Sequence, residues 1–132
     1  MSSTTTLLIK ASSLFVLSIN SLALLTGTRV LANPSTKIFV PKTTSTALAE
    51  SQIRYLAGMA AALGAIAWWA SDDLQTRQVP LAIAGMGPFV GGIGRALAGW
   101  KHGFGPGMRG AMWAELAIPV VIYGIGKFQG VW

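Results

Sequence analysis

Four ionisable residues of this sequence fall in or beside long apolar segments, where charge is costly. Glu50 and Arg54 are four residues apart, so a helix places them on one face. Arg95 and Glu115 lie in two further apolar segments, and all four charges fall toward the same side if these segments cross a membrane. A carboxylate can act as general base or general acid, and an arginine can stabilise developing negative charge. The sequence therefore predicts a catalytic cluster of Glu115, Arg95, Arg54 and Glu50 at membrane depth.

Other interpretations of these charges stay open. Arg54 and Arg95 lie near the ends of their apolar segments, so each side chain can instead extend to the lipid headgroups. Glu115 can instead form a purely structural ion pair with one arginine, setting the register of two helices. A ligand-binding or catalytic role competes with both alternatives.

Three further residues are candidates for binding a substrate. Tyr55 and Trp113 neighbour the charged residues in the sequence and could line a pocket beside them. His102 is the only side chain of the chain whose ordinary pKa lies near neutrality, although it can also be an ordinary loop residue. Asp72 and Asp73 are interpreted as polar residues that separate two helices.

The composition is that of a small membrane protein. Of 132 residues, 52% are hydrophobic and only 11% are charged, compared with about 25% charged in soluble domains. The cations behind the net charge of +6 are scattered, so we expect no nucleic-acid partner. The chain has no cysteine and one histidine, which excludes disulfides, thiol catalysis and Cys-type or His-rich metal sites. We expect no metal and no redox cofactor.

Four apolar segments can position these residues. They cover about residues 7–25, 51–70, 79–98 and 109–127, each close to the roughly 20 residues that a spanning helix needs. The sequence thus predicts an all-α bundle of four transmembrane helices forming one membrane domain over residues 1–132. The first segment is the most polar and contains Lys10. It could alternatively be a signal peptide cleaved after Ala32, but we expect a retained helix.

The connections between the segments predict a topology. An even number of spans places both termini and the connection 71–78 on one side, and the connections 27–49 and 99–110 on the other. The second side holds more basic residues, which favours the cytoplasm: Arg29, Lys37, Lys42, Lys101 and Arg109 against Lys10, Arg77 and Lys127. The connection 99–110 contains five glycines, so we expect no regular helix there.

Glycines and tryptophans have ordinary explanations within this arrangement. The four-residue spacing of Gly87 and Gly91 predicts close helix packing, and this glycine-rich third segment could also mediate a homo-oligomer. Trp68, Trp69 and Trp100 fall at segment ends, where aromatic side chains meet the membrane interface.

Several short motifs carry a family resemblance. Residues 50–127 resemble the small four-helix membrane proteins of the DUF4345 family, through their order and spacing rather than through any one motif. The matching motifs are Arg54-Tyr55-Leu56-Ala57-Gly58, Trp68-Trp69-Ala70-Ser71-Asp72-Asp73, Gly92-Ile93-Gly94-Arg95, Gly105-Pro106 and Glu115-Leu116. The sequence is also similar to small membrane proteins of fungal polyketide and meroterpenoid pathways, among them epoxide hydrolases of the aurovertin-pathway type.

The resemblance implies a membrane-embedded biosynthetic enzyme that opens an epoxide by water or by an internal hydroxyl. Glu115 would activate the nucleophile, while Arg95 and Arg54 would orient it and stabilise the oxyanion. Glu50 would protonate the epoxide oxygen or hold Arg54. His102 and Trp113 would shape the entrance.

The expected partners are a lipophilic polyketide or terpenoid substrate and membrane lipid, in the endoplasmic reticulum. Two other function classes remain open: a non-catalytic membrane scaffold, and a lipid-binding or transport protein. The scaffold predicts that Glu115 tolerates a neutral substitution, whereas the enzyme predicts that it does not.

Overall fold

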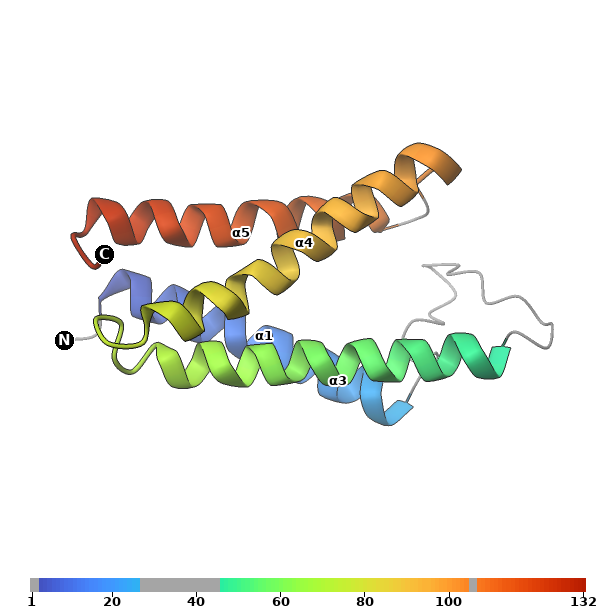
Figure 1. Ribbon diagram of the computed structural model, residues 1–132, viewed down its shortest axis with the longest axis horizontal. Helices are drawn as coiled ribbons and strands as arrows, with labels where there is room; N and C mark the ends of the chain where they lie inside the picture. Colours follow the sequence, from blue (N-terminus) through green and yellow to red (C-terminus); the bar gives the residue numbers. More distant parts are fainter. Residues whose placement is uncertain (1–2, 27–45, 105–106) are drawn as a thin grey trace.

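The computed structural model describes residues 3–26, 46–104 and 107–132, without the side chains of residues 26 and 46–50. It has four helices, α1 (Thr4–Thr26), α3 (Thr46–Ala70), α4 (Gln78–His102) and α5 (Met108–Phe128), and no strand within the described residues (Figure 1). Each helix contains a stretch long and apolar enough to cross a bilayer. The predicted all-α fold with four candidate membrane spans is therefore confirmed.

The helices are longer than the predicted segments. α3 begins at Thr46, and α4 continues to His102. The prediction that the connection 99–110 contains no regular helix is wrong for 99–102 and 108–110. Gly103 ends α4 with a φ of 85°, a conformation that favours glycine, and its N–H donates to the carbonyl oxygen of Gly99. The glycine at 103 thus stops a helix that continues through the earlier glycine at 99.

Neighbouring helices pack in the order α1–α3–α4–α5, and the chain ends meet at one end of the bundle. α1 packs mainly against α3, α3 also packs against α4, and α4 packs against α5. Both termini and the turn between α3 and α4 lie together on the left of Figure 1, and the connection between α4 and α5 lies at the opposite end. This arrangement matches the predicted even number of crossings. We call the two ends the terminal end and the α4–α5 end.

Glycines set where the helices approach one another. Gly64 of α3 faces Val16 and Leu17 of α1, and the side chain of Leu63 occupies the space where a Cβ of Gly87 would stand. Further along α4, Gly92 faces Leu116 of α5. α4 thus contacts α3 before Pro88 and α5 after it, and the ribbon of α4 crosses obliquely between these helices (Figure 1). Pro88 lacks the N–H that would bond to residue 84, which weakens the helix at this change of partner.

The outward surface is strongly apolar, as a lipid-facing surface should be. Large hydrophobic side chains are exposed on all four helices, among them Phe15, Leu56, Val90 and Val121. A soluble monomer rarely exposes so much contiguous apolar surface. The exposed residues therefore agree with a multi-pass integral membrane protein.

Candidate functional site

Arg95 and Glu115 form an ion pair that joins α4 and α5, two helices long and apolar enough to cross a membrane. Arg95 Nε donates a hydrogen bond to Glu115 Oε2 over 2.8 Å. Arg95 lies about two turns before the end of α4 at His102, and Glu115 about two turns after the start of α5 at Met108. Both residues are therefore about 10 Å inside the ends of their antiparallel helices. The predicted approach of Arg95 to Glu115 is confirmed.

Two glycines let α5 come close enough for this contact. A Cβ at Gly92 would come 2.9 Å from Leu116 Cγ, which would force one of them to move, and 3.2 Å from Glu115 Cβ, which is a tight contact. Gly91 lies one turn before Arg95 on the same face of α4, and a Cβ there would stand 3.9 Å from Glu115 Oε2. The carboxylate thus lies over a glycine surface and within reach of the arginine.

The Arg95–Glu115 pair leaves much of its hydrogen-bonding capacity unused. In the part of the chain that the structure describes, the terminal guanidinium nitrogens of Arg95 and Oε1 of Glu115 make no hydrogen bond. The side chains are 47% and 26% exposed, respectively, so neither is sealed inside the bundle. An arginine has five N–H donors, and four of them belong to the two terminal nitrogens. The pair can therefore present anion-binding donors and one proton-accepting oxygen to a ligand.

Arg54 does not join this pair. Its Nη1 donates to the carbonyl oxygens of Leu24 over 2.8 Å and of Leu25 over 3.2 Å, near the C-terminus of α1. Carbonyl oxygens in the last turn of a helix lack intrahelical partners, and the negative end of the helix dipole attracts a cation. The predicted convergence of Arg54 with Glu115 is thus corrected to a helix-capping contact. The side chain of Glu50 lies outside the described residues.

The three predicted substrate-binding residues are exposed and lie on three helices: Tyr55 on α3, His102 on α4 and Trp113 on α5. His102 follows Arg95 by two turns on the same face of α4. Trp113 is only two residues from Glu115, and helix geometry points such residues in different directions. The contribution of these three residues to a binding site stays a prediction.

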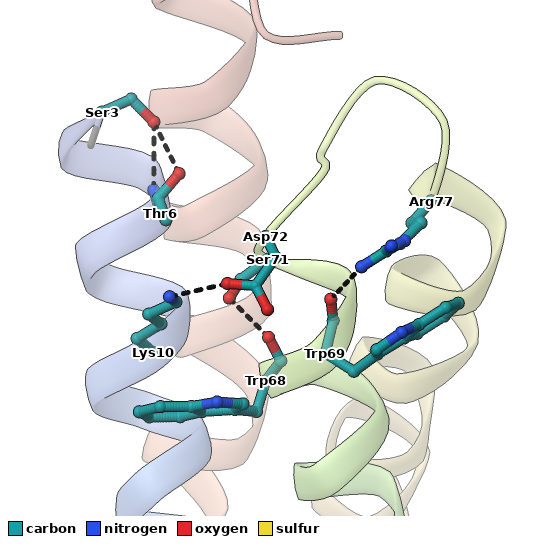
Figure 2. Close-up of polar contacts among 8 residues, drawn as sticks. All are labelled: Ser3, Thr6, Lys10, Trp68, Trp69, Ser71, Asp72 and Arg77. Carbon is teal, nitrogen blue, oxygen red and sulfur yellow. Dashed lines mark hydrogen bonds and ion pairs between the residues drawn. The ribbon is translucent and has the colours of Figure 1, made fainter. Parts of the chain in front are cut away.

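A second ion pair, at the terminal end, was missed in the sequence. Lys10 Nζ of α1 lies 2.7 Å from Asp72 Oδ1, and the same ammonium lies 5.4 Å from the ring centroid of Trp68 (Figure 2). Asp72 belongs to the connection 71–77, so this pair joins α1 to the turn between α3 and α4. The interpretation of Asp72 as a merely separating residue overlooked this role. The sequence already places Lys10 and Asp72 on the same predicted side of the membrane, and this shared position could have indicated the pair.

Arg77 and Trp69 make further contacts at the terminal end, beside the Lys10–Asp72 pair. Arg77 Nη1 donates to the carbonyl oxygen of Trp69 over 2.8 Å, and its guanidinium carbon lies 4.2 Å from the centroid of that ring (Figure 2). Ser71 is buried and donates its hydroxyl to the carbonyl oxygen of Trp68 over 2.6 Å. These contacts hold the turn against the end of α3, which is typical of a structural role.

Comparison with known proteins identifies the family. A family model described as "Domain of unknown function (DUF4345)" matches residues 4–125, which include α1, α3, α4 and most of α5. The match begins well before residue 50, where the sequence motifs first indicated the resemblance. Neither the curated proteins nor the solved structures that were compared gave a match. The Arg95–Glu115 pair lies inside the matched region, and the chain belongs to the DUF4345 family.

Proposed function

We propose that the chain is a membrane-embedded enzyme that opens an epoxide of a lipophilic polyketide or terpenoid substrate. The observation that carries this proposal is the partial use of the Arg95–Glu115 pair, in which Arg95 contacts the carboxylate through Nε alone. The carboxylate keeps Oε1 for a proton, and the guanidinium keeps its terminal N–H groups for an oxyanion. The choice of an epoxide rests on the resemblance to fungal pathway hydrolases.

The residues of the pair can perform each proton step of this reaction. Oε1 of Glu115 accepts a proton from water while the water oxygen forms a bond to one epoxide carbon. The C–O bond of that carbon breaks, its electron pair passes to the epoxide oxygen, and the terminal N–H groups of Arg95 stabilise the resulting alkoxide. The protonated Glu115 then returns its proton to the alkoxide. The product is a vicinal diol, and both residues are back in their initial state.

The position of the pair suits a substrate dissolved in the bilayer. Hydrocarbon cores are about 30 Å thick, and α4 with its 25 residues is about 37 Å long, so Arg95 lies inside the hydrocarbon near one interface. Both side chains are partly exposed, so a lipophilic molecule can reach them laterally. Charges at this depth are expensive to maintain, which favours a functional explanation for them.

The deciding experiment replaces the proposed base. Glu115→Gln retains a carbonyl oxygen that can accept the Nε hydrogen bond of Arg95, but it cannot take up the proton. We expect turnover of a pathway epoxide to fall by about 10²–10⁴-fold, the usual contribution of a general base. The assay uses purified protein in nanodiscs and follows incorporation of the oxygen of labelled water into the diol. Thermal melting of the variant checks that the fold persists.

Asp72→Asn is the matched control, because it also removes a carboxylate from an ion pair, at the opposite end of the bundle. We expect its turnover to equal that of the wild type. Full activity of Glu115→Gln would remove that residue from catalysis. A cyclised product without label would show that an internal hydroxyl of the substrate, and not water, is the nucleophile. No turnover of any pathway epoxide, with intact recruitment of partner enzymes, would favour the scaffold.

A further inference from the structure

In the part of the chain that the structure describes, two cations at the α4–α5 end pair with no carboxylate. Lys101 lies in the last turn of α4, and Arg109 lies in the first turn of α5. We call these two exposed residues the basic rim. Within the described residues, neither of them forms an ion pair with a carboxylate; Arg109 lies over the ring of Phe104, 5.3 Å from its centroid.

The distribution of the three acids whose side chains the structure describes explains this excess; the side chain of Glu50 is not among them. The whole sequence has four acidic residues, and two of them, Asp72 and Asp73, lie at the terminal end. Glu115 is already paired with Arg95, and no acid occurs between Asp73 and Glu115. Among the described carboxylates, none therefore remains for the basic rim. An exposed group of cations at a membrane surface attracts an anionic group, and each contributes to that attraction.

The basic rim also has a defined position relative to the Arg95–Glu115 pair. Lys101 follows Arg95 by six residues on α4, and Arg109 precedes Glu115 by six residues on α5. Because the two helices run antiparallel and meet at the pair, both offsets lead toward the same surface, by about 9 Å at 1.5 Å per residue. Lys101 and Arg109 thus lie at one level, nearer the surface than the pair by about this distance.

We infer that the Arg95–Glu115 pair acts on an anionic amphiphile, whose acidic head group binds the basic rim while its reactive group reaches the pair about 9 Å deeper. This inference rests on the proposed function, and it narrows the substrate to a lipophilic acid, a carboxylate or a phosphate. The negative charge of the substrate's head group is complementary to the basic rim. Its apolar tail suits the exposed hydrophobic faces of the helices deeper in the membrane. Binding of the head group fixes how deep the hydrocarbon tail of the substrate lies. One position along that tail is thereby held next to Arg95 and Glu115.

The test measures binding separately from turnover. Purified protein in zwitterionic nanodiscs is titrated with a mid-chain epoxide of a long-chain fatty acid and with its methyl ester, which has the same epoxide but no charge. We expect the acid to bind about tenfold or more tightly than the ester. Lys101→Gln combined with Arg109→Gln should remove this preference and leave the ester unaffected. Lys127→Gln, which removes an exposed cation at the opposite end, is the matched control and should change neither affinity.

The outcomes separate this inference from the proposed function. Equal affinities for acid and ester, or a preference that survives the double substitution, would overturn the inference even if the epoxide is turned over. An acid preference that depends on Lys101 and Arg109 but is accompanied by no turnover would support head-group binding and contradict the enzyme. Loss of the preference when anionic phospholipid is added to the nanodiscs would assign the rim to bulk lipid and overturn the inference. Glu115→Gln should keep the acid preference while losing turnover.

Discussion

Lys10 and Asp72 form an ion pair of 2.7 Å that joins α1 to the turn between α3 and α4, at the end of the bundle opposite the Arg95–Glu115 pair. Of the three acidic residues whose side chains the structure describes, Asp72 and Glu115 are each paired with a basic residue of another element. The two pairs differ in their surroundings. The ammonium of Lys10 also lies over the ring of Trp68, whereas no aromatic ring is found over Arg95 among the described residues.

The Lys10–Asp72 pair should contribute measurably but modestly to stability. The side chains are 33% and 51% exposed, so solvent screens their attraction. In a double-mutant cycle of Lys10→Gln and Asp72→Asn, we expect a coupling free energy of about 0.2–1 kcal/mol that decreases with added salt. Reversible unfolding in mixed micelles measures it. Strictly additive single effects would show that the contact adds no stability.

Gly92 and Gly94 should respond differently to the same substitution. Gly92→Ala forces Leu116 and Glu115 away from α4, and we expect a loss of about 1–3 kcal/mol, because overfilled contacts displace their neighbours. A Cβ at Gly94 meets nothing within 4 Å, so Gly94→Ala should be neutral or stabilise α4 by up to about 1 kcal/mol through helix propensity. Thermal melting of the two variants makes the comparison. Equal effects at both positions would contradict the described approach of α5 to Gly92.

Asp73 should make stability depend on acid pH. Hydrogen bonds from the hydroxyl and the backbone N–H of Thr76 lower the pKa of Asp73 below its ordinary value. A lowered pKa in the folded state means that the charged carboxylate stabilises the fold above the ordinary pKa. This contribution is lost as the pH falls through the folded-state value. Asp73→Asn should therefore be less stable than the wild type at neutral pH and equal to it in strong acid.

Thr76→Val is the matched variant for this effect, because it removes the hydroxyl and keeps the shape of the side chain. NMR titration of the Asp73 carboxyl should show a pKa nearer the ordinary value in Thr76→Val than in the wild type. An unchanged titration would show that the hydroxyl of Thr76 does not control the carboxyl group.

Topology can be tested with small tags in sealed microsomes. Both chain ends and the turn 71–77 lie at one end of the bundle, so tags at the termini and in this turn should have the same protease accessibility. A tag in the connection 27–45 should have the opposite accessibility and should be cytoplasmic, because that side carries more lysine and arginine. Termini on different sides would contradict the four-span arrangement. A reversed orientation of all tags would contradict only the cytoplasmic assignment.

The amino-acid sequence by itself determined the number of helices and the position of each charge along its helix. Long apolar segments must form helices in a bilayer, because no water is available for backbone N–H and C=O groups. Position along such a segment is depth, at about 1.5 Å per residue. Arg95 and Glu115 fall at equal depth on neighbouring segments, and the cost of isolated charge predicts that they meet. This expectation agrees with the structure.

The tertiary structure decided which of several residues at one depth actually meet. Arg54 has a depth suited to Glu115, but the packing of α3 against α1 brings it to the carbonyl oxygens of Leu24 and Leu25. The packing of α1 against α3 also brings Lys10 close to Asp72, which follows the end of α3. A sequence gives the position of a residue along its helix axis, whereas its partner depends on the rotation of each helix and on the order of helices around the bundle. Those two properties arise from the contacts of all helices together, including the glycine contacts that bring α4 to α3 at one end and to α5 at the other.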